Sequence, residues 1–235
     1  MHPFSRHPVC LALGSVLKGT LCERVFGADL RQFSKGDHVF RPGDRANALH
    51  RVVSGLIGIS SPAPDGDDVM LRLAGPDEVF GELCFCGDAQ KHLATALEPT
   101  TIVSAPADRV IAALRERPEL ALDLIRLLSE RLASAYADVQ AATGDRLVTR
   151  LARKLVELCV VDQGDGWYRL AHRLTHDELA QLLGVQRESL TRAMIDLRAL
   201  GLIDYSAHMP VKVALGAVHR FIATERAGDG AVKPA

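Results

Sequence analysis

Short apolar runs alternate with turn signals in the first half of the chain. Between about Asp29 and Ala107, glycine stands repeatedly beside an acid, a proline or a serine, as in the KGD, PGD and FGE triplets. Glycine supplies positive φ and proline or aspartate starts a reversal, so these are turn chemistries. The runs between them, such as LIGIS, VMLRLA and TTIVSAP, are of strand length and rich in β-branched residues. This pattern predicts a small antiparallel β-barrel or roll.

A helical period replaces this alternation after Pro118. From Glu119 to Gly144 there is no proline and no internal glycine, and two sets of apolar residues recur at helical spacing. The first set, here called the seam, follows the heptad spacing of helices that pair with a second helix. The seam comprises Ile125, Leu128, Leu132, Ala135, Val139 and Ala142, and the neighbouring set comprises Leu120, Leu124 and Leu127. Two apolar faces need two partners, so we expect the neighbouring set to cover the barrel and the seam to pair with a second copy in a dimer. The alternative is an ordinary amphipathic helix buried within one chain, which has the same pattern.

A second helical pattern covers residues 146–161. Its apolar side comprises Leu147, Leu151, Leu155 and Leu158. The stretch DQGDGWYRL that follows predicts a loop and then a strand. Residues 227–235 are expected to form a disordered tail.

The segment LTHDELAQLLGVQRESLTRAMIDLRALGLI, residues 174–203, predicts two helices joined by a tight turn. Thr175 followed by Glu178 is a capping box, in which hydroxyl and carboxylate each accept a hydrogen bond from a backbone N–H group at a helix start. Gly184 stands where the turn needs positive φ. The second helix is then expected from about Gln186 to Leu200. Its core-facing side is expected to comprise Leu190, Ala193, Leu197 and Leu200.

Polar side chains gather at the leading end of this second helix. They are Gln186, Arg187, Glu188, Ser189, Thr191 and Arg192. Arginine donates two hydrogen bonds to guanine and a carboxylate accepts one from cytosine, so this face suits base edges in the major groove. A solvated charged face is the alternative. Capping box, glycine turn and polar end together favour a helix-turn-helix that binds double-stranded DNA.

The distribution of charge agrees with a nucleic-acid partner. The 235-residue chain has a net charge of −1, but residues 1–145 carry 15 basic and 19 acidic side chains, whereas residues 146–226 carry 12 basic and 9 acidic ones. A polyanion is therefore expected to bind to the C-terminal part. No stretch reaches the roughly 18 apolar residues that span a bilayer, so we expect a cytoplasmic protein without a membrane segment.

The order of these elements, with GELCFC in the barrel and VQRESLTR in the second helix, resembles the Crp/Fnr family of bacterial transcription regulators from about Arg24 to Ile222. The resemblance implies an α+β protein. It would have a cyclic-nucleotide-binding-like β-roll sensor domain at 24–117, a dimerisation helix at 118–144 and a winged helix-turn-helix domain at 145–226. The resemblance also implies a homodimer that binds a near-palindromic site and works with RNA polymerase, with no catalytic residues.

The resemblance extends to the DNA-reading positions. Arg187, Glu188 and Arg192 match the side chains that cyclic-AMP-responsive members use on a TGTGA-type half-site. Thr191 departs from the glycine usual there and is closer to the serine of oxygen-responsive members. The family pattern therefore implies a TGTGA-like half-site that this departure could shift.

The family's nucleotide cradle is kept only in part. Gly81, Glu82 and Leu83 match its Gly-Glu-Leu turn, in which the glutamate holds the ribose hydroxyl. His92 and Leu93 stand in place of an Arg-Ser pair that binds the cyclic phosphate. A largely neutral imidazole is a weaker phosphate donor than a guanidinium, and leucine cannot donate.

Two positions of the long helix depart from the family as well. Ala135 and Tyr136 stand where cyclic-AMP-responsive members have a threonine and a serine that meet the base. Together with the altered cradle, this predicts that cyclic AMP does not bind in the usual mode. Lys91 beside His92 leaves room for another nucleotide or a different small anionic effector.

Cysteine chemistry offers other interpretations of the sensor domain. Oxygen-responsive relatives bind an iron–sulfur cluster through closely spaced N-terminal cysteines and one barrel cysteine, a pattern that Cys10 and Cys22 do not supply. A haem site would need Cys84 or Cys86 and His92 as axial ligands, but such residues in a turn are more often structural, so haem is not expected. The CxC spacing is shorter than that of the common zinc-binding pair, so a zinc site is not expected either. A thiol switch through the same cysteines stays open.

Two other functions are alternatives to a sensing regulator. A metal enzyme of the cupin kind would need clustered ligands, but the barrel region holds only His38, His50 and His92 and has no HxH motif. We therefore predict no enzyme activity and no metal site. A constitutive DNA-binding protein with a purely structural barrel is the remaining alternative.

Overall fold

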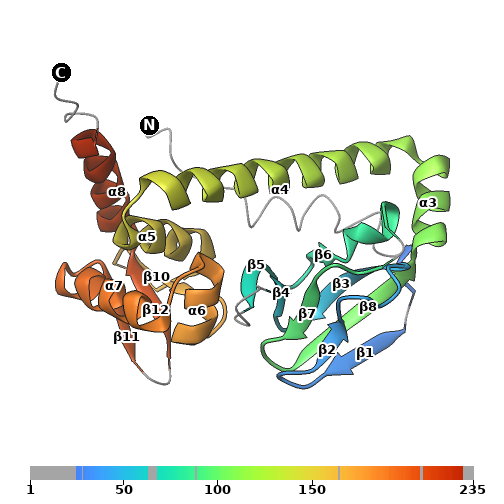
Figure 1. Cartoon of the computed structure of the whole chain (residues 1–235), viewed down its shortest axis with the longest axis horizontal. Coiled ribbons are helices and arrows are strands. Elements are labelled where there is room, and N and C mark those ends of the chain that lie inside the picture. The colour runs from blue at the N-terminus through green and yellow to red at the C-terminus, as the bar shows by residue number, and fades with distance from the viewer. Residues whose placement is uncertain are drawn as a thin grey trace. The chain divides into compact units, whose positions relative to one another are not determined.

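The computed structural model describes residues 25–27, 29–62, 68–87, 89–163, 165–206 and 209–229. The chain forms two units, residues 1–134 and 135–235, and the division lies within the long helix α4 (Pro118–Gly144). Strands dominate before α4 and helices after it (Figure 1). The predicted fold class, a β-roll followed by a long helix and a winged helix-turn-helix, is confirmed, whereas the predicted domain boundaries stay predictions.

Two antiparallel four-stranded sheets make up the β-roll of the first unit. One has the order β1-β8-β3-β6 and the other β2-β7-β4-β5. The strands are β1 (Leu30–Phe33), β2 (His38–Phe40), β3 (Ala48–Ser54), β4 (Ile57–Ser61), β5 (Val69–Ala74), β6 (Val79–Phe80), β7 (Leu93–Ala96) and β8 (Thr100–Pro106). Their inward residues, among them Ile57, Phe80 and Ile102, form a core of fully buried side chains. Buried and less buried residues alternate along β7, as the period of two predicts, whereas β4 is buried over most of its length.

Helix α3 (Ala107–Glu116) and the first part of α4 pack on this roll through a second apolar cluster. Leu120 and Leu127 of α4 are buried in it, and Leu124 packs against it. The seam lies elsewhere on the helix, where all its large apolar members, Ile125, Leu128, Leu132 and Val139, are exposed in the single chain. The helix therefore has the two separate apolar faces that its sequence predicts, and one of them is covered by the roll.

The second unit surrounds a four-stranded antiparallel sheet with four helices. The sheet order is β11-β12-β10-β9. The elements are α5 (Leu147–Leu158), β9 (Cys159–Asp162), β10 (Trp167–Leu170), α6 (His176–Leu183), α7 (Arg187–Ala199), β11 (Ile203–Ser206), β12 (Met209–Ala214) and α8 (Leu215–Asp229). Leu151, Leu155 and Leu179 are among the fully buried residues of its core. The hairpin of β11 and β12 follows α7 directly, as the wing of a winged helix-turn-helix does.

Three details of the sequence prediction are wrong. Leu200 is 59% exposed because α7 ends at Ala199 and Leu200 is its C-cap, while Met194 takes the fully buried place. Helix α5 ends at Leu158 rather than at residue 161, because the β-branched Val160 and Val161 belong to strand β9, which pairs with β10. Helix α8 includes residues 227–229 of the predicted tail, and 230–235 lie outside the described residues.

Candidate nucleic-acid interface and effector cradle

Helices α6 and α7 are joined as the predicted turn requires. Thr175 is the N-cap of α6: its hydroxyl accepts from the Glu178 backbone N–H at 3.1 Å, and the Glu178 carboxylate accepts from the Thr175 N–H at 2.6 Å. Gly184 ends the helix with φ of 62°, a conformation that favours glycine. Arg150 of α5 donates to the Leu183 carbonyl and so satisfies a free acceptor at the end of α6. The capping box and the turn are thereby confirmed.

The polar leading end of α7 is free of the protein core. Gln186, Arg187, Glu188, Ser189 and Arg192 are exposed, whereas Thr191 is half-buried. On the opposite side Leu190, Ala193, Met194 and Leu197 are buried against the rest of the unit. The helix is therefore anchored by one face and presents donors and an acceptor on the other.

Two contacts tie this leading end to the start of α6. Arg187 Nη1 lies 3.3 Å from Asp177 Oδ2, and both side chains are exposed. The Thr191 hydroxyl donates to the Arg187 carbonyl at 2.9 Å and lies 3.3 Å from His176 Nδ1. Asp177 and His176 were missed by the sequence analysis. The capping box places them in the first turn of α6, but no local pattern says that this turn faces α7.

The other end of α7 carries a separate contact. Arg198 lies 3.7 Å from Asp204 of β11, and its guanidinium stacks 5.1 Å from the centroid of the Tyr205 ring. Both charged side chains are exposed. This pair joins the end of the helix to the wing and lies outside the polar face.

The cradle turn in the first unit is built on a tight approach of two strands. Gly81 has φ of 84°, and a Cβ there would lie 2.9 Å from His50 Cδ2, so only glycine fits. His50 Nδ1 lies 2.8 Å from the Ser104 hydroxyl, and its ring packs against both Phe40 and Phe80. Burial, with Arg31 adding to it, lowers the pKa of His50 to about 4, so this imidazole is neutral at pH 7. The turn η1 (Glu82–Phe85) begins directly after Gly81.

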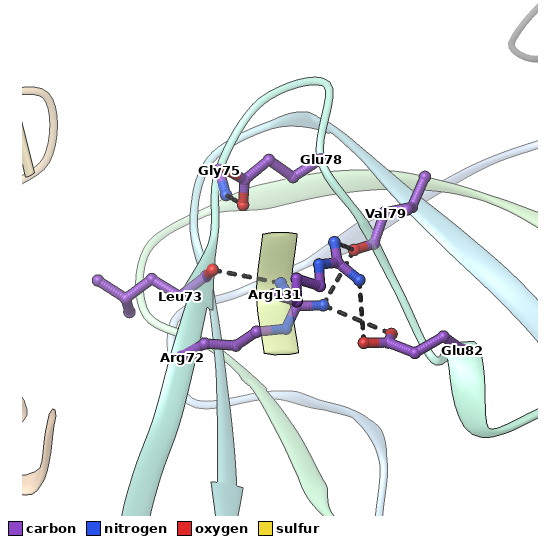
Figure 2. A network of polar contacts seen from close by, with 7 residues as sticks. All are labelled: Arg72, Leu73, Gly75, Glu78, Val79, Glu82 and Arg131. Atoms are coloured by element: carbon purple, nitrogen blue, oxygen red, sulfur yellow. Dashed lines mark hydrogen bonds and ion pairs between the residues drawn. The ribbon is translucent and has the colours of Figure 1, made fainter. Parts of the chain in front are cut away.

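Glu82 is held by two arginines (Figure 2). Arg131 of α4 donates from Nη1 to Glu82 Oε1 at 2.9 Å and from Nη2 to the Val79 carbonyl at 2.6 Å. Arg72 of β5 donates from Nη2 to the same carbonyl at 3.0 Å and lies 3.5 Å from Glu82 Oε2. Both carboxylate oxygens therefore have a cationic partner from this chain. We call these three side chains the cradle triad: Arg72, Glu82 and Arg131.

The pKa values of Glu82 and Arg72 reflect their burial and the charged groups around them. Burial opposes ionisation of Glu82, but Arg72 and Arg131 outweigh it and lower the pKa of the carboxyl. Burial, with Arg131 as the next cause, lowers the pKa of Arg72 to about 10. The Glu82 carboxylate is therefore ionised and the Arg72 guanidinium is charged at neutral pH.

The remaining predicted cradle residues are placed less tightly. Leu83 is half-buried in η1, Lys91 is exposed, and His92 is half-buried just before β7. Burial lowers the pKa of His92 although Glu82 opposes this, so the imidazole is mostly neutral at pH 7. Tyr136 of α4 is exposed, and its assignment to the pocket stays a prediction. Arg72 and Arg131 lie outside the cradle motif, so the sequence did not predict their place in this site.

The cysteines near the cradle differ in their surroundings. Burial, with Glu82 adding to it, raises the pKa of Cys84 to about 11, so its thiol is protonated at neutral pH. Cys84, the exposed Cys86 and Cys159 are all free thiols. Cys10 and Cys22 lie outside the described residues.

Neither a metal site nor a membrane span is found in the part of the chain that the structure describes. No group of three or more histidine, cysteine or acidic side chains there is arranged to hold a metal ion. No helix among those residues has the length and apolar character needed to cross a bilayer.

Both parts of the chain match known families and curated proteins. Residues 30–117 match the cyclic nucleotide-binding domain family, and residues 149–213 match the Crp-like helix-turn-helix domain family. A CRP-like cAMP-activated global transcriptional regulator of Mycobacterium tuberculosis (strain H37Rv) is 32% identical over 174 residues, 73% of this chain and 78% of the relative. A global nitrogen regulator of Nostoc sp. is 27% identical over 215 residues, 86% of this chain and 95% of the relative.

The fold matches solved regulators over most of the chain. A CRP/FNR-family transcriptional regulator from Thermus thermophilus has a TM-score of 0.65 and 28% identity, and the match covers 84% of this chain and 100% of that one. FixK2 from Bradyrhizobium japonicum, at 19% identity, shares the fold with a TM-score of 0.73 over 83% of this chain and 96% of that one. From these matches and the geometry of α6 and α7, the chain belongs to the Crp/Fnr family of DNA-binding transcription regulators.

Proposed function

We propose that this regulator is a homodimer that reads a near-palindromic, TGTGA-like DNA site through α7 and works with RNA polymerase rather than as an enzyme. The observation that carries the proposal is the leading end of α7, where five polar side chains are exposed while the opposite face is buried. Such a helix fits the major groove, with Arg187, Glu188 and Arg192 toward base edges.

A random-library selection tests the reading mode. DNA selected by the protein should contain an inverted repeat whose half-sites are about one helical turn apart, because a two-fold dimer presents two copies of α7. A selected sequence with a single half-site, or no enrichment at all, would remove the palindrome from the proposal.

The exposed seam of α4 supports the dimer. Its large apolar side chains lie on one stripe of a 27-residue helix and are exposed in the part of the chain that the structure describes. Knobs-into-holes pairing with a second copy would bury them. Leu132→Glu should therefore convert a dimer to a monomer in native mass spectrometry, whereas Leu71→Glu, a matched change at an exposed leucine of β5, should leave the dimer intact. A wild-type monomer at micromolar concentration would contradict the proposal.

An altered effector pocket is the third part of the proposal. In the nucleotide-binding members, the glutamate at the Glu82 position accepts a ribose hydroxyl; here Arg131 and Arg72 each contact one of its oxygens, which leaves each oxygen able to accept a further hydrogen bond. The phosphate clamp is replaced by His92, whose pKa is lowered by burial, and by Leu93. Cyclic AMP should therefore not raise the melting temperature of the protein, whereas a His92→Arg/Leu93→Ser variant should gain a cyclic-AMP-dependent rise. Saturable stabilisation of the wild type would contradict this.

A constitutive regulator with a purely structural roll is the second candidate. The cradle triad favours it in one respect, because Glu82 has two cationic partners from this chain without any ligand. The names of the relatives leave the effector open, since one is called cAMP-activated and another a global nitrogen regulator. The protonated thiol of Cys84 argues against the redox alternative. Equal affinity for the selected DNA with and without a library of nucleotides would favour the constitutive form.

A further inference from the structure

An exposed isoleucine lies on the outward face of α7. Ile195 is 55% exposed, and within α7, all of which the structure describes, it is the one large apolar side chain that is exposed. The buried side chains of this helix are Leu190, Ala193, Met194 and Leu197. At about 100° per residue, Ile195 lies about 100° or more around the helix from each of them. It therefore does not contribute to the face that anchors the helix.

Ile195 shares one stripe of the helix with three of the predicted reading residues. Glu188, Thr191 and Arg192 precede it by seven, four and three positions, so the four side chains fall within about 100° of the helix surface. The reading helices of homeodomains contact DNA bases from four positions with the same spacing. In a helix that lies in the major groove, Ile195 would therefore face the bases about one turn beyond Arg192.

The chemistry of this position suits an apolar group on a base. Isoleucine has no hydrogen-bond donor or acceptor, and the apolar group that base edges present in the major groove is the C5-methyl of thymine. Asp196, the next residue, is exposed about 100° further around the helix, so it does not add a polar group to the stripe at this level. Contact between the isoleucine and the methyl would remove apolar surface of both from water.

We propose that Ile195 is a specificity-determining residue that packs on a thymine methyl and so selects thymine at one base pair of each half-site. The inference rests on the proposed function, in which α7 reads DNA in the major groove. Arginine and glutamate side chains read hydrogen-bonding groups on bases, whereas this contact depends on a methyl group.

Replacement of thymine by uracil tests the inference, because uracil lacks the methyl and keeps the groups that form hydrogen bonds. Each thymine of the selected site is replaced in turn, at the equivalent place in both half-sites, and affinity is measured by gel shift. At one position uracil should weaken binding of the wild type about 4- to 16-fold, which corresponds to about 2- to 4-fold for one buried methyl in each half-site. With Ile195→Ala, the same replacement should change affinity less than about 2-fold.

Two variants on the same helix are the controls, and both should keep the uracil effect. Leu200→Ala truncates a leucine that is 59% exposed but lies outside the stripe, at the C-cap. Thr191→Ser removes the other methyl group of the stripe and keeps the hydroxyl that donates to the Arg187 carbonyl.

Folding of the Ile195→Ala variant is checked separately. The side chain is exposed and alanine favours a helix, so the midpoint of urea unfolding, followed by Trp167 fluorescence, should stay at the wild-type value. Affinity for a shuffled duplex of the same length should also stay unchanged, whereas affinity for the selected duplex should fall.

Three results would overturn the inference. One is that Ile195→Ala removes the uracil effect at no thymine of the selected site. Another is that Thr191→Ser removes it instead, because Thr191 would then read the methyl. The third is an equal loss of affinity for selected and shuffled DNA in Ile195→Ala, which would place the side chain on the DNA backbone.

Failure of the proposed reading mode gives a different result. If Arg187→Ala and Arg192→Ala both leave the ratio of selected to shuffled affinity unchanged, α7 does not read bases and the proposed function is wrong. If they lower this ratio but the uracil effect does not depend on Ile195, the reading mode stands and the role of Ile195 is refuted.

Discussion

Two arginine–carboxylate pairs, one in each unit, have similar chemistry and different surroundings. Arg131 and Glu82 lie 2.9 Å apart with side chains 19% and 26% exposed, and Arg131 also donates to a backbone carbonyl. Arg187 and Asp177 lie 3.3 Å apart with side chains 63% and 57% exposed. Partial burial commits the first pair to the fold, because neither charge has enough water to replace its partner. Because both side chains of the second pair are exposed, water can hydrate each charge, and Arg187 can leave Asp177 for another acceptor at little cost.

The largest expected effect comes from breaking the buried pair. Arg131→Ala should lower the free energy of unfolding of the roll by about 2–3 kcal/mol, because Glu82 loses its shorter ion pair and the Val79 carbonyl loses a donor. The single tryptophan, Trp167, lies in the second unit. Tryptophan fluorescence therefore does not report unfolding of the roll. Hydrogen exchange measured by mass spectrometry on peptides covering residues 69–85 would report it instead.

Arg126→Ala is the control on the same helix. Arg126 is exposed and pairs only one turn away, with Asp123, so its loss should change stability by less than about 0.5 kcal/mol. Similar exchange protection in the two variants would show that the cradle triad does not stabilise the roll.

A change in the exposed pair should instead affect recognition. Arg187→Ala should weaken binding to the selected site by about 1–3 kcal/mol, at one base pair of each half-site, and leave binding to shuffled DNA nearly unchanged. Competition gel shifts with single base-pair substitutions measure this. Arg198→Ala, at the other end of α7, is the control. An equal loss on selected and shuffled DNA would mean that Arg187 contacts only the DNA backbone.

The pH dependence of the roll sharpens the comparison further. The pKa of Glu82 is lowered in the folded protein, so its ionisation stabilises the fold above the ordinary value of 4.5, and this contribution is lost as the pH falls through the folded value. Glu82→Gln should therefore cost about 1 kcal/mol at pH 7, and the difference from the wild type should shrink below about pH 4.5. His50 titrates in both proteins and cancels in the difference. A difference that is constant with pH would contradict an ionised Glu82.

Local signals explain why the reading helix could be predicted and the cradle triad could not. Thr175 with Glu178, and Gly184, are within a few residues of the helix ends that they determine. The misplaced Leu200 had a local signal too: Gly201, with φ of 67°, follows it and marks the end of α7.

The triad has no such local signal. Arg131 is 49 residues from Glu82, and the two meet only because α4 packs on the roll through Leu120 and Leu127. The cradle motif therefore located Glu82, but tertiary packing decides what its carboxylate contacts. The Arg187–Asp177 contact was predicted in part. The sequence predicts both helices, but only the structure shows that these two side chains pair across the turn.

The smallest expected effect separates stability from recognition at the exposed pair. Asp177→Asn should change the free energy of unfolding of the second unit by less than about 0.5 kcal/mol, because both charges remain hydrated when the pair is lost. Trp167 fluorescence during urea unfolding reports this unit directly. A loss above about 1 kcal/mol would show that Asp177 stabilises the helix-turn-helix itself, and the exposed pair would then resemble the buried one. A near-zero change would show that the exposed pair, unlike the pair of Arg131 and Glu82, does not stabilise the fold.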